Sequence, residues 1–246
     1  MLSIVIPTKN EEEYLPILLE TIWRQTLQPA EIIVADAGSS DRTREVARAS
    51  GCRVVEGGMP GPGRNRGAET AISPYILFLD ADVQLLDPSF LERAMEEIRE
   101  RNLDFATCDV VPLSPRPIDR VFHRFYNRYS RLCQPIHAHA PGFCIFARKS
   151  LHDRVGGFDE SVVFCEDHDY AERCCKVGSF AFLDSTKVHV SIRRFDRDGR
   201  MNIAVKYALS ELHLVTLGPI RHDGFKYEFG YKKKASIPDA DRERLA

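Results

Sequence analysis

The first 111 residues alternate short apolar runs with amphipathic segments, and this pattern limits the fold more than any other feature of the chain. The apolar runs are typical of buried strands and cover residues 2–6, 31–35, 53–56, 75–79 and 103–111. The segments between them have apolar residues at helical spacing and cover 13–25, 40–50, 64–72 and 87–101. We predict that Ser39 or Ser40 caps the second helix and that Asp87 and Pro88 begin the fourth. Strands that alternate with helices form a parallel, doubly wound sheet, so we predict an α/β fold.

The pattern becomes less regular after residue 111. We predict helices at 118–132, 166–177 and 201–217, and strands at 143–147, 180–183 and 187–192. A chain of 246 residues that is 43% hydrophobic can bury one large core. We therefore predict one domain over residues 1–217, made of the halves 1–111 and 112–217. A polar, partly aromatic tail follows at 218–246.

The composition excludes several classes of protein. A formal net charge of -2 gives no reason to expect a nucleic-acid partner. The seven cysteines are odd in number and form no Cys-x-x-Cys pair, which fits a reducing cytosol better than disulfides or a zinc site. The N-terminus lacks the pattern of a signal peptide, and no run of 18 apolar residues could span a membrane. We expect a cytoplasmic protein.

Asp80 and Asp82 follow directly after the apolar run at 75–79. Two carboxylates one residue apart at the end of a buried strand can hold a hard divalent cation, because Mg²⁺ and Mn²⁺ take oxygen ligands and share them with phosphates. An Asp-x-Asp pair is also common by chance, and the alternative is a strand end followed by a turn. The neighbouring motifs favour a site that handles a nucleotide diphosphate.

Polar residues also follow the first two predicted strands, at 7–11 and 35–41. Ligands of an open α/β sheet bind outside the carboxyl ends of its parallel strands, so these segments should meet Asp80 and Asp82 in one crevice. Thr8 and the backbone beside it could contact a base, and Asp36 could accept hydrogen bonds from a base or a ribose. The alternative is that Asp36 and Ser39 only cap the following helix.

The segment 61–67 is a glycine-rich turn with two arginines, Arg64 and Arg66, leading into a helix. Backbone amides at a helix N-terminus favour anions, and arginine adds a charge suited to phosphate. The spacing is not that of a dinucleotide fingerprint, and the chain contains no P-loop motif.

Two further motifs have a structural and a functional interpretation. Glu166, Asp167 and Asp169 begin a predicted helix, where they could simply complement the helix dipole or could supply a general base. His189 lies in a predicted strand, where it could be an ordinary strand histidine or a metal ligand.

The motifs taken together resemble glycosyltransferase family 2, whose members have the GT-A fold. The similarity runs from Leu2 to about Arg194 and rests on five short segments in the order that the family has them. They are Ser-Ile-Val-Ile-Pro-Thr-Lys-Asn-Glu, Glu-Ile-Ile-Val-Ala-Asp-Ala-Gly-Ser-Ser-Asp-Arg-Thr, Gly-Arg-Asn-Arg-Gly, Leu-Asp-Ala-Asp and Glu-Asp. Each segment is weak by itself, whereas their ordered combination is specific.

The resemblance implies the site residues and their roles. It implies Asp167 as the catalytic base, with Glu166 beside it, and Mn²⁺ or Mg²⁺ held by Asp80, Asp82 and His189. The residues implied in nucleotide-sugar binding are Pro7, Thr8, Asn10, Glu11, Asp36, Arg64, Asp80, Ala81, Gly142, Arg193 and Arg194. Residues 1–111 would bind the nucleotide sugar and residues 112–217 the acceptor.

The implied activity is that of an inverting, hexosyltransferase-type enzyme. Asp167 would take the proton of an acceptor hydroxyl during a single displacement at the anomeric carbon. Two alternatives remain, a nucleotidyltransferase of related fold and a non-catalytic protein that binds nucleotide sugars. The residues do not choose between UDP, GDP and dTDP donors.

The predicted helix at 118–132 is basic and amphipathic. Its apolar face holds Ile118, Val121, Phe122, Phe125, Tyr126, Tyr129 and Leu132. Arginines surround that face at Arg116, Arg120, Arg124, Arg128 and Arg131. The face could pack on the sheet or on a second subunit of a homodimer. Alternatively, 116–132 and the tail at 225–234 could contact the inner face of the cell membrane, where the acceptor would be lipid-linked rather than a free saccharide.

Overall fold

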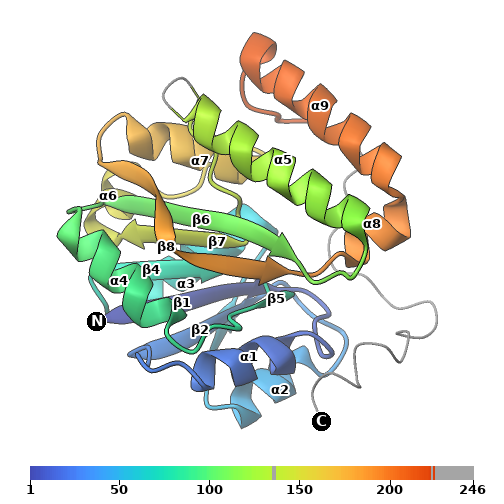
Figure 1. The fold of residues 1–246 in the computed structure, drawn as a ribbon. Coiled ribbons are helices and arrows are strands. Elements are labelled where there is room, and N and C mark those ends of the chain that lie inside the picture. The colour runs from blue at the N-terminus through green and yellow to red at the C-terminus, as the bar shows by residue number, and fades with distance from the viewer. Residues whose placement is uncertain (135–136, 223, 225–246) are drawn as a thin grey trace.

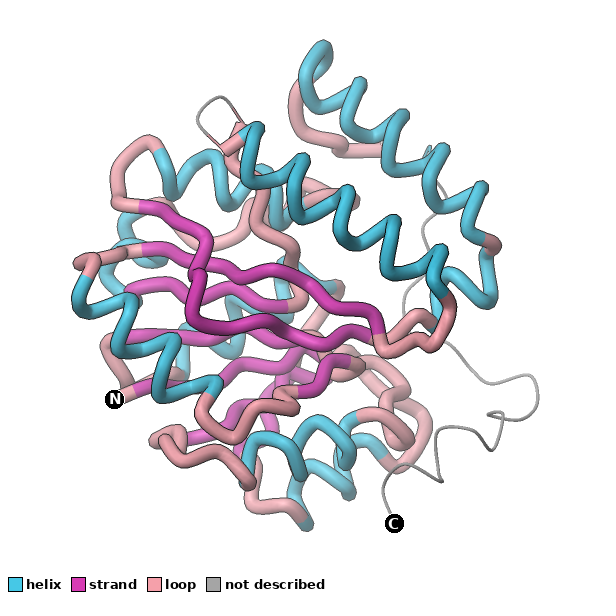
Figure 2. The backbone as a smooth tube through the Cα atoms, in the orientation of Figure 1, coloured by secondary structure: helices cyan, strands magenta, loops and turns pink. Residues whose placement is uncertain are grey.

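An eight-stranded sheet runs through the middle of the molecule, and helices cover both of its faces (Figures 1 and 2). The computed structural model describes residues 1–134, 137–222 and 224. The strand order is β3-β2-β1-β4-β7-β6-β8-β5. The tail segment 225–234, for which a membrane contact was predicted, lies outside the described residues.

The first half of the chain forms the parallel part of the sheet. Its strands are β1 (Leu2–Thr8), β2 (Glu31–Asp36), β3 (Arg53–Glu56) and β4 (Tyr75–Leu79). The pairs β1–β2, β1–β4 and β2–β3 are all parallel, so the predicted doubly wound arrangement is confirmed here. Thr8 lies opposite Asp36 in the ladder between β1 and β2, which brings two of the predicted polar strand ends together.

The second half makes the sheet mixed. Its strands are β7 (Cys144–Arg148) and β8 (Phe180–Val190), and both pair with β6 (Phe105–Pro112), which closes the first half. The short β5 (Val83–Gln84) pairs with β8 at the far edge. Strand β7 runs antiparallel to both β4 and β6. The two strands predicted at 180–183 and 187–192 are one continuous strand, because β8 stays paired with β6 across a register shift between Cys108 and Asp109.

Helices cover both faces of the sheet. One face carries α1 (Leu15–Trp23), α2 (Thr43–Ala49) and α4 (Phe90–Glu100), and the other carries α3 (Pro60–Thr70), α6 (Lys149–Arg154) and α7 (Glu166–Cys175). Alternation along β1 supplies both cores, since Ile4 and Ile6 belong to the first cluster and Val5 to the second. Helix α3 packs closely on β1 at Gly67. A Cβ atom at this position would lie only 2.3 Å from the Val5 side chain, so the close packing requires glycine.

Three predicted helix starts are wrong, and for two of them local hydrogen bonds explain the difference. Helix α4 begins at Phe90, because Asp87 accepts a bond from the Ser89 amide (2.9 Å) and forms a turn before the helix. Helix α2 begins at Thr43, beyond a loop in which the Ser40 amide donates to Asn10 (2.9 Å). Helix α3 begins at Pro60, so the predicted glycine-rich turn forms the first turns of the helix itself.

An outer layer is formed by α5 (Pro117–Cys133), α8 (Arg193–Asp198) and α9 (Arg200–Leu217). Helix α9 lies along α5 in Figure 1, and the Tyr129 hydroxyl donates to Glu211 (2.8 Å) between them. The apolar residues of both helices are largely exposed, namely Ile118, Val121, Phe125, Leu132, Met201, Val205, Leu209, Leu212, Val215 and Leu217. No helix in the described part of the chain is long and apolar enough to cross a membrane.

Candidate active site

Asp36, at the end of β2, is fully buried and is held by other protein groups. Its carboxylate accepts hydrogen bonds from the Ser39 amide (3.0 Å), the Ser39 hydroxyl and the Thr8 hydroxyl (3.3 Å). The Arg44 guanidinium pairs with it as well. Burial raises the pKa of Asp36, but the bonds from Ser39 and Arg44 outweigh burial and hold that pKa below its ordinary value. Asp36 therefore carries a negative charge and orders the turn after β2.

The segment after β1 is fastened to the same turn. Asn10 has a positive φ of 57°, which is uncommon for a residue with a side chain. Its side-chain oxygen accepts the Ser40 amide, and its own amide donates to the Ser39 hydroxyl (2.8 Å). The ends of β1 and β2 thus form one ordered polar edge, as the motifs predicted.

Arg64 lies at the centre of a second group of site residues. Its side chain is 2% exposed and donates to Glu166 (2.7 Å), Asp80 (2.9 Å) and the Gly142 carbonyl (3.0 Å). These partners come from the start of α7, the end of β4 and the loop before β7. The structure therefore brings together four predicted site residues that are far apart in the sequence.

Asp167 lies beside this group at the start of α7. Its carboxylate accepts the Gly142 amide (2.6 Å) and the His168 amide (2.9 Å). Burial raises the pKa of Asp167 above its ordinary value and Arg64 opposes this, which makes the carboxylate a better proton acceptor than an exposed one. A side chain at Gly142 would collide with Arg64, since its Cβ would lie 2.7 Å from Nη2. The residue before the Glu166-Asp167 pair, Cys165, has a positive φ of 57°.

Arg193, at the start of α8, closes a third group. Its guanidinium donates to Asp82 (2.7 Å), makes two bonds to Glu11 (2.8 and 2.7 Å) and lies 4.4 Å from the centre of the Tyr14 ring. Burial raises the pKa of Glu11 to about 7, although Arg193 opposes that rise. Arg193 therefore ties the segments after β1 and β4 to the end of β8.

The donor set at Asp80 and Asp82 fits a hard cation. Each carboxylate is partly exposed, and only one of its two oxygens pairs with an arginine. The second oxygen of each carboxylate lies outside these pairs and could bind a cation. His189 lies on β8 opposite Gln84, and its Nδ1 has no hydrogen-bond partner among the described residues. Within that part of the chain, His189 does not join Asp80 and Asp82 in one cluster with metal-ligand spacing. Its role as a ligand stays a prediction.

The remaining predicted residues lie at the edges of these groups. Pro7 pairs with Ala35 in the ladder, Ala81 is buried between the two aspartates, and Arg194 follows Arg193 in α8. Sequence reasoning missed Arg44 and Tyr14, which contact Asp36 and Arg193. Arg44 follows the 37–41 segment by about one helical turn, so the sequence could have predicted its contact with Asp36. No local pattern predicts the contact between Tyr14 and Arg193.

The sequence model of "Glycosyl transferase family 2" matches residues 3–156. The uncharacterised glycosyltransferase EpsJ of Bacillus subtilis is 29% identical over 189 residues, which are 69% of this chain and 54% of EpsJ. The chain thus spans about half the length of that relative.

Two further matches cover more of the chain. A PGL/p-HBAD biosynthesis glycosyltransferase of Mycobacterium bovis is 28% identical over 239 residues, covering 90% of this chain and 87% of the relative. The mannosyltransferase PcManGT of Pyrobaculum calidifontis, solved with GDP-Man and Mn²⁺, has a TM-score of 0.64 at 18% identity, covering 85% of this chain and 64% of that one. The structural likeness concerns the fold alone. The family match covers more than half of the residues, and the chain therefore belongs to glycosyltransferase family 2 and has the GT-A fold.

Proposed function

We propose that this protein transfers a sugar from a nucleotide-diphosphate sugar to an acceptor hydroxyl, with inversion at the anomeric carbon. The observation that carries the proposal is Asp167, a largely enclosed carboxylate (18% exposed) with a raised pKa, held by the Gly142 amide beside the Arg64–Asp80 pair. A general base next to a cluster suited to a diphosphate is what a single displacement requires.

The donor would lie along the ends of β1, β2 and β4. Thr8, Asn10 and Asp36 form the ordered edge that would receive the nucleoside, and Asp36 keeps its charge there. Arg64, Arg193 and Arg194 would bring positive charge to the diphosphate. The GDP-Man bound to PcManGT supports this class of donor.

Asp80 and Asp82 would hold a Mn²⁺ or Mg²⁺ ion, which supplies positive charge to the departing diphosphate. The protein's own residues prepare that position. Arg64 pairs with Asp80 and Arg193 with Asp82, which orders both carboxylates, and Glu166 holds Arg64 through its other terminal nitrogen.

Asp167 would act in the chemical step. Its carboxylate accepts the proton of the acceptor hydroxyl while the hydroxyl oxygen forms the new bond to the anomeric carbon. The bond from that carbon to the diphosphate breaks on the opposite face, and the electron pair leaves with the diphosphate. The configuration inverts because attack and departure occur on opposite faces.

We further propose that the acceptor is lipid-linked and that the protein works at a membrane surface, on the inner face of the cell membrane. The exposed apolar residues of α5 and α9 support this, because Phe125 is 70% and Leu212 60% exposed. The exposed arginines Arg120, Arg124 and Arg128 all lie on α5. Positive charges beside exposed apolar side chains suit an anionic lipid surface.

A thermal-shift screen with Mn²⁺ and UDP-, GDP- and dTDP-sugars tests the proposal. A ligand that binds only the native state raises the melting temperature, so one donor should raise it when metal is present. Asp82→Asn should abolish the metal-dependent part of the shift. A shift of equal size in the chelated wild type would contradict the metal role. Release of pyrophosphate from a nucleoside triphosphate and a sugar phosphate would favour the nucleotidyltransferase alternative.

A further inference from the structure

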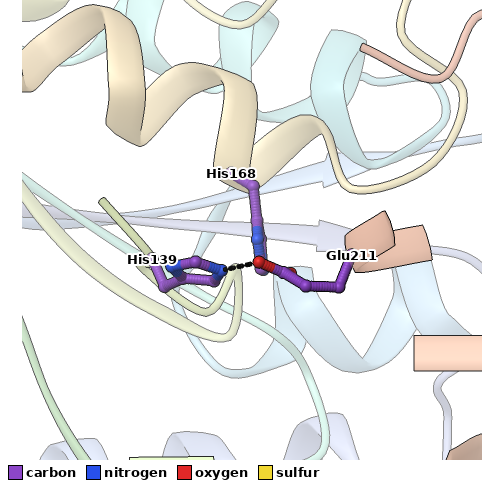
Figure 3. Close-up of side chains that lie close together, drawn as sticks. All are labelled: His139, His168 and Glu211. Carbon is purple, nitrogen blue, oxygen red and sulfur yellow. Dashed lines mark hydrogen bonds and ion pairs between the residues drawn. The ribbon is translucent and has the colours of Figure 1, made fainter. Parts of the chain in front are cut away.

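His139, His168 and Glu211 form a cluster outside the donor site. They come from the loop before β7, the start of α7 and the middle of α9, and Figure 3 shows their side chains turned toward one another. One ligand atom from each residue lies within 4.8 Å of the other two. Tetrahedral zinc ligands lie about 3.4 Å apart, so a shift of about an ångström would bring the three to coordination distance.

His139 is oriented as a metal-binding histidine usually is. Its ring is 3% exposed and its Nδ1 lies 2.9 Å from the His137 carbonyl, which leaves Nε2 facing Glu211 (2.9 Å). Metal-ligating histidines commonly donate their second ring nitrogen to a backbone carbonyl. Both ring nitrogens face oxygen acceptors, so without a cation each nitrogen must carry a proton to make its bond. A metal ion would replace the proton on Nε2, the nitrogen that faces Glu211.

His168 brings a nitrogen that needs a partner. Its Nδ1 is buried and makes no hydrogen bond within the described residues. Its ring meets the His139 ring nearly edge to face, with centres 4.6 Å apart.

A small cavity opens at this cluster. It measures about 30 Å³, close to the space of one water molecule or ion, and its lining includes His137, Glu172 and the three cluster residues. Two imidazoles and a carboxylate suit a borderline transition metal, whereas the all-oxygen pair Asp80 and Asp82 suits Mn²⁺ or Mg²⁺.

We propose that His139, His168 and Glu211 bind one zinc-class dication, separate from the cation of the donor site. The ion joins α9 to the start of α7 and to the loop before β7. His168 directly follows Asp167, and Gly142, whose amide bonds Asp167, lies three residues beyond His139. The metal thus has a structural role, because it links three segments next to the proposed base. This proposal does not depend on the proposed sugar transfer.

Calorimetric titration of the chelator-stripped full-length protein with Zn²⁺ tests the proposal. We expect one equivalent of Zn²⁺ to bind and to raise the melting temperature. Glu211→Gln keeps the size and the hydrogen bonds of the side chain but removes its charge, and it should weaken Zn²⁺ binding at least about 10-fold. Cobalt in place of zinc should give the strong visible absorption of a tetrahedral site without a thiolate charge-transfer band.

His213→Gln is the matched control, because His213 and His222 form a second histidine pair near the end of α9 (3.3 Å). The control should leave Zn²⁺ affinity unchanged. His168→Gln gives an independent reading if Glu211→Gln fails to fold by circular dichroism. Unchanged affinity in the folded cluster variants, loss of affinity in the control, or a thiolate band from the cysteines would overturn the assignment.

Discussion

Asp167 illustrates how single residues are tuned at this site. Its environment is apolar enough to raise its pKa, yet two backbone amides hold both carboxylate oxygens in place. Gly142 supplies one of these amides and, through its carbonyl, also meets Arg64 (3.0 Å). One glycine therefore aligns the proposed base with the cationic centre, and a larger residue would separate them.

Asp167→Asn should lower kcat by roughly 10²–10⁴-fold, because the amide cannot accept the proton of the acceptor. Donor binding should persist, since the two aspartates that would hold the metal ion and the arginines that would contact the diphosphate are unchanged. Steady-state kinetics with the identified donor, together with a donor thermal shift, check both parts. Weak donor binding by the variant would argue against the role of Asp167 as base.

His152 should make stability depend on pH. It is 5% exposed, and burial lowers its pKa to about 4 in the folded protein, from 6.5. The unfolded chain therefore binds a proton first, so the stability from neutral His152 is complete above pH 6.5 and declines toward pH 4. The loss amounts to roughly 3 kcal/mol in the free energy of unfolding. Urea unfolding at pH 7, 6 and 5 should show a steeper decline for the wild type than for His152→Gln, and parallel declines would refute the assignment.

At the scale of elements, α5 departs from ordinary amphipathic packing. Its buried positions include the polar residues Asp119, His123 and Ser130, while much of its apolar face is exposed. Asp119 is 1% exposed and pairs with Arg200 of α9 (2.6 Å), and Asn127 bonds the backbone of Val110 in β6 (3.0 Å). Polar bonds thus fasten the outer layer, which leaves apolar side chains free for another surface.

The full-length protein should co-sediment with anionic phospholipid vesicles at low salt and less so at high salt. Phe125→Asp should weaken binding roughly 10-fold, because it removes an apolar side chain from the contact and adds a negative charge. Ile72→Asp is the matched control, since Ile72 is equally exposed (71%) but lies just beyond the end of α3, outside the outer layer. Equal binding of all three proteins, or no binding by the wild type at low salt, would refute the membrane proposal.

At the scale of the whole molecule, the two halves share one sheet. Strand β7 of the second half pairs with β4, and β5 of the first half lies beyond β8 at the far edge. Arg64 adds a polar link between the halves, from α3 to Glu166 and Gly142. We therefore propose that residues 1–217 behave as one cooperative unit.

Arg64→Leu should lower the free energy of unfolding by about 3–5 kcal/mol, because it leaves Glu166 and Asp80 without their buried partner. Arg66→Leu, on the exposed side of the same helix (49%), should change it by about 0.5 kcal/mol or less. Thermal unfolding followed by calorimetry should give one transition for the wild type. Two separate transitions, or equal effects of the two substitutions, would contradict the shared core.

The accuracy of sequence reasoning depended on how local each feature is. The parallel strands β1 to β4 and the strand-end positions of Thr8, Asp36 and Asp80 follow from short-range patterns, and the structure agrees with them. Helices α6 and α8 and strand β5 were not predicted, because they are short and have little periodicity. Strand β8 was split in the prediction because residues 184–186 are polar, yet pairing with β6 carries the strand through them.

The sequence by itself determined the α/β class, the order of the first strands and the residues at their ends, because apolar periodicity and turn chemistry act over a few residues. Only the tertiary structure decided which charges meet. Arg193 pairs with Glu11 across 182 residues of sequence, and His139 meets Glu211 across 72. Such pairs depend on distances that the packing of the sheet and helices sets, and electrostatic and metal-binding chemistry follows those distances rather than the order of the chain.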